Sequence, residues 1–264
     1  MKKALLFTCS LALIAGLSCK KQSTANNPST VNSVSTDYKA FIIEFTATWC
    51  PHCGTYAYPS WKAVFPNHQY KVTGISVHEA DDIVVTDYPA QAPLQNFYQC
   101  AGYPTSGYGV TGNGYPSAGY YDGPINTAVA ANAQAKAGIG IAKSISGNTM
   151  TVTTKTVFFQ DVQGPLNLAV YMTEDGIVND QNTETTMLTA VTHDHVFRGS
   201  AGDAAFGSLL VAGNGVKGST YDKTYTINIP SDVRNRNNLH IVVVLFRVDP
   251  VTGNPTDVIN SNTI

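Results

Sequence analysis

Two cysteines three positions apart, Cys50 and Cys53, are the side chains of this sequence best suited to covalent chemistry. A thiolate at the first position is a nucleophile toward disulfides, and the spacing lets the second thiol attack the mixed disulfide that forms. His52 lies between them and can add positive charge or a hydrogen bond. We therefore predict a thiol–disulfide exchange site in which Cys50 is the nucleophile, Cys53 the resolving thiol and His52 the residue that tunes the pair.

The flanking residues predict the elements that position this site. Residues 41–45 are bulky and apolar on either side of one acid, which indicates a strand buried on both faces. Residues 56–65 suit a helix that packs on that strand. Cys50 is then expected at the start of a helix, where unpaired backbone N–H groups and the helix dipole favour the thiolate. In such settings the pKa of a CxxC thiol falls to about 3.5–7, which makes the disulfide oxidising.

The segment of residues 45–53, FTATWCPHC, resembles the active-site segment of periplasmic members of the thioredoxin superfamily. In that superfamily a buried acid six residues before the nucleophile helps to move protons to and from the resolving cysteine. The resemblance therefore implies this role for Glu44. The alternative is that Glu44 is a solvent-facing residue of the strand.

The same resemblance implies a cis-proline opposite the cysteines. The two candidates are Pro104 and Pro116, and we favour Pro116 because a helical stretch follows it at residues 125–137. The residues that we expect to form the substrate-binding surface are Trp49, Pro51, Tyr115 and Pro116.

Zinc binding is the competing explanation of a CxxC motif. The histidines His52, His68 and His78 could complete a tetrahedral site, but the sequence has no second CxxC motif, and the strand–turn–helix setting suits redox chemistry better. We expect no metal and no soluble cofactor, because the redox couple is the disulfide between Cys50 and Cys53 itself.

Cys100 is the third thiol that remains beyond the first twenty residues. It is either a small buried hydrophobic residue in an apolar and aromatic stretch or a thiol that takes part in mixed disulfides.

The first residues of the chain predict export. Residues 1–18 have a short positive start and an apolar run too short to span a bilayer comfortably, as in a signal peptide. Small residues before Cys19 resemble a bacterial lipobox, which implies lipidation of this cysteine; an ordinary cleaved signal is the alternative. Residues 19–37 are rich in Ser, Thr and Asn and predict a flexible stalk. We therefore expect attachment to a membrane through a lipid anchor.

Composition excludes one large class of partners. The 264 residues include 16 Lys and Arg against 18 Asp and Glu, for a formal net charge of -2. Without a basic run there is no electrostatic reason to expect nucleic-acid binding.

The second half of the chain has a different pattern. Short β-rich runs separated by Gly-, Asn- and Asp-rich turns occur at residues 150–159, 166–173, 193–198, 225–229 and 240–248. This spacing predicts an antiparallel sandwich of about seven strands. The predicted fold class is an α/β thioredoxin-like domain over residues 38–136, followed by an all-β immunoglobulin-like sandwich over residues 137–264.

The whole chain resembles a Gram-negative family of outer-membrane lipoproteins named for a twenty-eight-kilodalton protein. The resemblance is carried by the lipobox-like signal, the CxxC region and a β-rich half that contains DHVFRG at residues 194–199. It implies a location in the cell envelope, at the outer membrane facing the periplasm or, alternatively, at the cell surface.

Together these features predict a thiol–disulfide oxidoreductase whose partners are cysteine-containing exported proteins or a redox partner. The alternative is a non-catalytic binding or assembly module of the outer membrane, in which the CxxC disulfide is structural. The density of Tyr and Gly at residues 98–123 favours this alternative, because such loops suit adaptable contact surfaces.

Overall fold

The computed structural model describes residues 30–264 except 32, 70, 85–87 and 117–118. The expected signal peptide of residues 1–18, the expected lipidation site Cys19 and residues 20–29 of the expected stalk lie outside the described residues. The backbone of the described residues 33–35 runs along a later strand, close enough that side chains at Gly138 and Gly140 would collide with it.

The first half of the chain alternates strands and helices. The strands are β1 (Ala40–Thr46), β2 (Val72–His78), β3 (Thr105–Tyr108) and β4 (Thr111–Gly114). The helices are a π-helical turn η1 (Cys53–Ala57), α1 (Tyr58–Asn67), α2 (Gln91–Phe97) and α3 (Asp122–Ala131). β1 and β2 pair in parallel, and β3 pairs antiparallel with the other edge of β1.

The second half is almost entirely β. Its strands are β5 (Ala137–Ser146), β6 (Thr149–Phe158), β7 (Leu166–Glu174), β8 (Ile177–Asn182), β9 (Met187–His193), β10 (Val196–Ser200), β11 (Ser208–Val211), β12 (Thr220–Asn228), β13 (Leu239–Val248) and β14 (Pro255–Thr263). Two short 3-10 turns, η2 (Ala201–Asp203) and η3 (Arg236–Asn238), connect them. Strands β12, β6 and β5 form a three-stranded sheet, and β8 and β9 form a separate hairpin.

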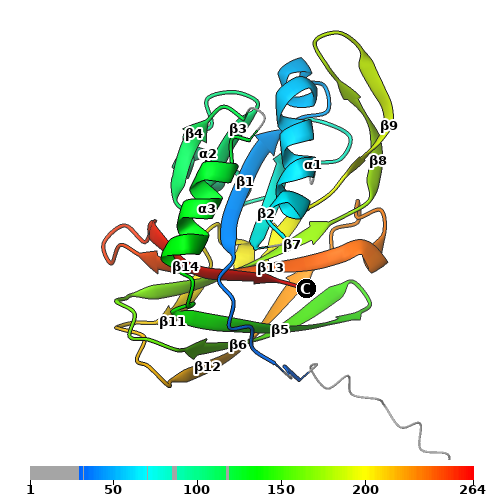
Figure 1. The fold of residues 1–264 in the computed structure, drawn as a ribbon. Helices are drawn as coiled ribbons and strands as arrows, with labels where there is room; N and C mark the ends of the chain where they lie inside the picture. The colour runs from blue at the N-terminus through cyan, green and yellow to red at the C-terminus, as the bar shows by residue number, and fades with distance from the viewer. Residues whose placement is uncertain (1–29, 32, 70, 85–87, 117–118) are drawn as a thin grey trace, which may run out of the picture.

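A nine-stranded mixed sheet runs through both halves of the chain in the order β14-β13-β7-β10-β2-β1-β3-β4, with β11 paired to β7 (Figure 1). The junction is β10, which pairs in parallel with β2 and antiparallel with β7. The predicted fold class, a thioredoxin-like α/β domain followed by an immunoglobulin-like sandwich, is therefore wrong. The molecule is mostly β, and its large sheet does not stop where the first half ends.

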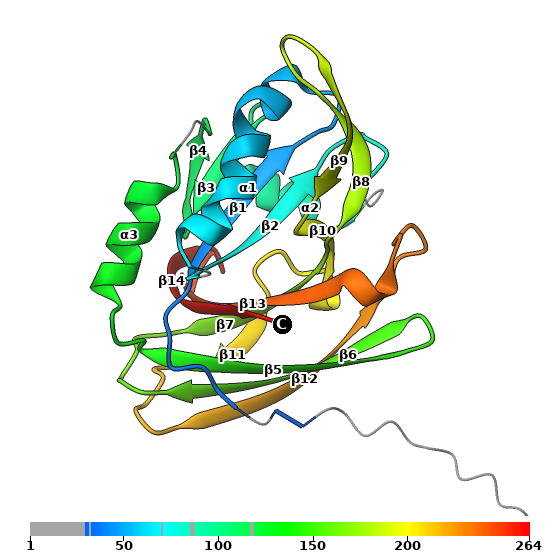
Figure 2. The same ribbon diagram turned by 45° about the vertical axis from the view of Figure 1, so that its right-hand side comes forward.

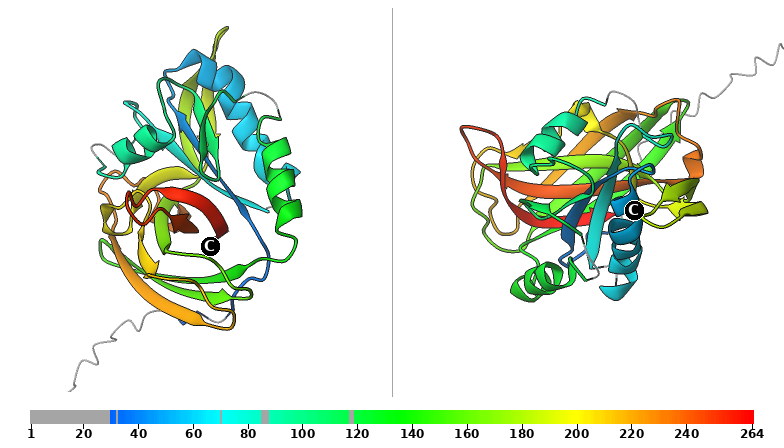
Figure 3. Two further views of the ribbon diagram at one scale, coloured as in Figure 1. Left: turned by 90° about the vertical axis from the view of Figure 1, so that its left-hand side faces the viewer. Right: turned by 90° about the horizontal axis from the view of Figure 1, so that it is seen from above.

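The apolar pattern of β7 and β13 explains this continuity. Almost every residue of these two strands is buried, so both of their faces need cover. One face packs on the three-stranded sheet of β5, β6 and β12 (Figure 3), and the other packs against residues of β1 and α2. In a two-layer sandwich each strand has one solvent-facing side, so its residues alternate between buried and partly exposed positions, as they do in β6. Strands β7 and β13 do not alternate in this way, so a two-layer sandwich alone does not accommodate them.

Side chains of β1 alternate between two cores, as in any strand. Phe41, Ile43 and Phe45 belong to the core shared with α2 and β13, whereas Ala40 and Ile42 pack with α1 and α3 on the opposite face. β1 is therefore buried on both faces, and it leads directly into the loop that contains the cysteines (Figure 2).

Candidate functional site

A disulfide joins Cys50 and Cys53 immediately after β1, with the two Cα atoms 5.2 Å apart. Cys50 is 3% exposed and Cys53 is fully buried. The backbone N–H of Cys53 donates to Sγ of Cys50 at 3.1 Å, and the N–H of Gly54 donates to the carbonyl of Cys50. The sulfur of Cys50 therefore lies at the start of a helical segment with a backbone donor aimed at it, an arrangement that favours a thiolate in the reduced protein.

The loop at Tyr103 and Pro104 forms one wall of the site. The carbonyl oxygen of Tyr103 lies 3.5 Å from Sγ of Cys50, and the ring of Tyr103 meets that of Trp49 edge-on at 6.0 Å. The peptide bond between Tyr103 and Pro104 is cis, whereas that before Pro116 is not. The preference for Pro116 as the cis-proline is therefore wrong. A helix does follow Pro116, but this order of elements does not determine which proline lies beside the cysteines.

Exposed side chains, mostly aromatic, form a rim next to the cysteine motif. Trp49 is 49% and Tyr115 51% exposed, and Pro51 is also exposed. The ring of Tyr115 lies 6.3 Å from that of His52 and 5.8 Å from that of Tyr56. Pro116 itself is buried. Three of the four residues expected at the substrate-binding surface are thus accessible on this rim.

Glu44 is buried inside β1, so the alternative of a solvent-facing residue is wrong. The Ser76 hydroxyl donates to its Oε1 at 2.8 Å, and Oε2 has no hydrogen-bond partner among the described residues. Burial raises the pKa of Glu44 to about 8, against a smaller opposing effect of the Ser76 hydrogen bond. Glu44 can therefore bind or release a proton near neutral pH.

His52 points to a residue of the second half of the chain. Its Nδ1 lies 2.7 Å from Oε1 of Glu184, whose other oxygen accepts a hydrogen bond from the hydroxyl of Tyr56 at 3.0 Å. Glu184 lies in the turn between β8 and β9. No local signal in the sequence identifies Glu184, because it lies more than a hundred residues from the CxxC motif.

The histidines weighed as zinc ligands do not converge on the cysteines. His68 pairs with Asp122 and His78 with Asp81, each at 2.7 Å. Within the part of the chain that the structure describes, no three His, Cys, Asp or Glu side chains are grouped to hold a metal ion.

Cys100 is a half-buried free thiol whose sulfur lies 3.5 Å from the carbonyl oxygen of Gly102. Burial raises the pKa of this thiol, so its reactive thiolate form is disfavoured near neutral pH.

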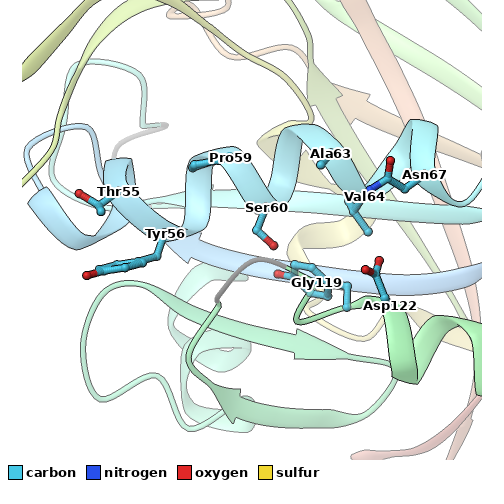
Figure 4. A pocket seen from close by; sticks show the side chains of 10 residues that line it. Thr55, Tyr56, Pro59, Ser60, Ala63, Val64, Asn67, Gly119 and Asp122 are labelled. Carbon is cyan, nitrogen blue, oxygen red and sulfur yellow. The ribbon is translucent and has the colours of Figure 1, made fainter.

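A cavity of about 320 Å³ lies along α1, beside the turn that leads into α3 (Figure 4). The lining residues are Thr55, Tyr56, Pro59, Ser60, Ala63, Val64, Asn67, Gly119, Tyr121 and Asp122. Tyr56 lines this cavity, and its ring also contacts that of Tyr115 on the aromatic rim.

The β8–β9 hairpin forms the other wall of the site and extends beyond the large sheet beside the N-terminal end of α1 (Figures 1 and 2). The side-chain amide of Gln181 lies within 3.3 Å of the carbonyl oxygens of Ala47, Thr48 and Cys50. Sequence reasoning missed Gln181 for the same reason as Glu184. Among the described residues, none of the helices has the length and apolar character to cross a membrane.

Comparisons with known proteins identify a family and solved structures of similar fold. A family model described as outer membrane protein Omp28 matches residues 91–262. Among solved structures, HBP35 of Porphyromonas gingivalis is similar at a TM-score of 0.70 and 15% identity, over 88% of this chain and 76% of that chain. Identity this low indicates a shared fold only. No curated protein matches. The matched family region leaves out Cys50 and Cys53 but contains the β8–β9 hairpin that contacts them.

Proposed function

This chain belongs to the Omp28 family of outer membrane proteins, and we propose that it exchanges disulfides with cysteine-containing exported proteins through Cys50 and Cys53. The family match confirms the predicted location in the cell envelope at the outer membrane. The partner proteins, the direction of electron flow and the lipid anchor at Cys19 belong to the proposal.

The observation that carries the proposal is the setting of the Cys50 sulfur. It lies at the start of a helical segment and receives the N–H of Cys53, and the motif is flanked by the exposed side chains of Trp49 and of Tyr115, whose ring contacts that of His52. Such donors stabilise the thiolate of a reduced CxxC pair, which makes Cys50 both a nucleophile and a good leaving group.

The exchange conserves atoms and electrons. A client thiolate attacks Sγ of Cys50, the bond between Cys50 and Cys53 breaks, and Cys53 leaves as a thiolate that takes up a proton. A second client thiolate then attacks the mixed disulfide, which releases an oxidised client and leaves the Cys50–Cys53 pair reduced by two electrons. Glu44, with its pKa near 8, supports the proton transfer that accompanies these steps.

Trapping of mixed disulfides tests this function. We expect Cys53→Ser to accumulate covalent complexes with exported proteins at Cys50, because the resolving thiol is absent, and Cys50→Ser to accumulate none. Cys100→Ser is the matched control and should behave as the wild type. A reduction potential below about -300 mV together with no trapped complexes would contradict exchange, since structural disulfides lie in that range.

The second candidate is the non-catalytic outer-membrane module with a structural disulfide. The family match favours it, because the matched residues 91–262 leave out the cysteines. The burial of Cys53 beneath the β8–β9 hairpin is also typical of a structural bridge. In this case Cys50→Ser would keep the binding of a partner protein while it lowers thermal stability.

A further inference from the structure

We propose that Gln181, on β8, is a positioning residue that holds the Cys50–Cys53 loop in shape when the disulfide is open and thereby raises its reduction potential. The inference concerns the same disulfide as the proposed function, and its biological meaning rests on that function. The reduction potential, however, is a property of the disulfide that can be measured without any client.

The side chain of Gln181 is 1% exposed and lies at the centre of four backbone carbonyl groups. Its Nε2 is 3.3 Å from the oxygens of Ala47, Thr48 and Cys50, and 3.0 Å from that of Asn182. An amide nitrogen has two hydrogens, so these acceptors share them. One buried group from the second half of the chain therefore contacts three of the four carbonyl groups that lead from β1 into the cysteine motif.

Neighbouring residues of the hairpin attach to the same loop. The backbone N–H of Asn182 donates to the carbonyl of Thr48 at 2.8 Å, and its side-chain amide donates to that of Trp49 at 3.2 Å. The fit leaves no space: a Cβ atom added to Gly54 would lie 2.0 Å from the carbonyl oxygen of Asn182. The hairpin thus packs backbone against backbone on the segment that contains Cys53.

The contribution of Gln181 depends on the redox state. In the oxidised protein the covalent bond itself holds Cys50 and Cys53 in register. After reduction that restraint is gone, and hydrogen bonds must keep the N–H of Cys53 aimed at the sulfur of Cys50. Loss of the Gln181 amide would remove the side-chain donor that these buried carbonyl groups share and leave them only the backbone N–H groups of Cys50, Asn182 and Gly54. In a loop now free to move, this loss would destabilise the reduced state more than the oxidised state.

Equilibration with glutathione tests the inference. Gln181→Met keeps the length of the side chain and removes its N–H donors. We expect the ratio of oxidised to reduced protein at a fixed glutathione poise to rise about tenfold, which is ~30 mV toward a more negative potential. We also expect the alkylation of Cys50 by iodoacetamide to require a higher pH. Gln160→Met, at an exposed position, is the matched control and should leave both measurements unchanged.

A purely structural role predicts a different result. In that case Gln181→Met would lower the thermal stability of the oxidised and reduced forms equally, and the glutathione equilibrium would stay within twofold of the wild type; this outcome overturns the inference. If Gln181→Met does not fold, the shorter side chain of Gln181→Asn withdraws the amide from the carbonyl groups of Ala47 and Cys50, and a potential equal to that of the wild type would overturn the inference instead. Failure of Cys53→Ser to trap clients refutes the proposed function alone, because the shift caused by Gln181→Met is measured on the disulfide of a protein that needs no client.

Discussion

At the scale of single residues, Glu44 shows how burial changes the chemistry of a common side chain. It lies on a strand whose residues are all buried, and the only hydrogen bond described for its side chain comes from the hydroxyl of Ser76 on the neighbouring strand. Water cannot solvate its charge there, so the protonated form is favoured up to a pH of about 8. The same burial that brings the pKa of Glu44 near neutral makes its charged form costly for the fold.

We expect Glu44 to make the protein less stable as the pH rises. The pKa of Glu44 is higher in the folded than in the unfolded chain. Its contribution to the free energy of unfolding is therefore fully present below about pH 4.5 and is lost as the pH rises through 8. At pH 7 the free energy of unfolding is lower than below pH 4.5 by on the order of 3 kcal/mol because of this group. Glu44→Gln should remove this slope when the free energy of unfolding is measured in urea between pH 5 and pH 8. Glu184→Gln, at an exposed glutamate, should keep it; parallel slopes for wild type and Glu44→Gln would refute the assignment.

At the scale of elements, the β8–β9 hairpin depends on a buried histidine at its base. The ring of His193 lies 5.4 Å from that of His78 and 5.5 Å from that of Tyr58, and its Nε2 has no hydrogen-bond partner among the described residues. Burial, and next the charge of His78, lower the pKa of His193 to about 4. The other charged groups that act on it are Asp81, Asp194 and Lys62.

Acid should therefore weaken the hairpin. The folded pKa of His193 lies below the unfolded value of 6.5, so its contribution to stability is fully present above pH 6.5 and is lost as the pH falls toward 4. The loss is about 3 kcal/mol in all. His193→Gln should reduce the fall in melting temperature between pH 7 and pH 4, whereas His52→Gln, at an exposed histidine, should not. Equal falls for wild type and His193→Gln would contradict this explanation.

At the scale of the whole molecule, a buried ion pair lies where the two halves of the sheet meet. Nε of Arg198 on β10 lies 2.8 Å from Oε2 of Glu174 on β7, and both side chains are at most 1% exposed. A second nitrogen of Arg198 donates to the carbonyl of Ile83, which follows β2, at 2.7 Å. Glu174 also accepts the backbone N–H groups of Arg234 and Asn235. The pair thus connects β7, β10 and the loop after β2.

Removal of one partner should destabilise the entire fold. Arg198→Met leaves the carboxylate of Glu174 buried without its counter-charge, and we expect a loss of about 3–5 kcal/mol in the free energy of unfolding. The matched control is the partly exposed pair of Arg247 and Asp257, where Arg247→Met should cost about 1 kcal/mol or less. Urea unfolding curves measure both values, and equal losses would show that the buried pair has no special role.

The sequence by itself determined the features that depend on neighbouring residues. The strand at residues 41–45, the helix that follows the cysteines, the pairing of Cys50 with Cys53 and five of the ten strands described in the second half were predictable, because periodicity and short spacing are local properties. The resemblance to the Gram-negative outer-membrane family was likewise visible in the residues and agrees with the matched family, whereas the resemblance to the thioredoxin superfamily gained no such support.

Only the tertiary structure decided which strands pair and what closes over the disulfide. β10 joins β2 across more than a hundred residues, and this pairing replaces the two expected folds with one continuous sheet. Gln181 and Glu184 reach the cysteine loop, and Pro104 rather than Pro116 lies beside it, through contacts of the same long range. Such contacts leave no periodic trace in the chain, since they arise from the burial of both faces of the central strands.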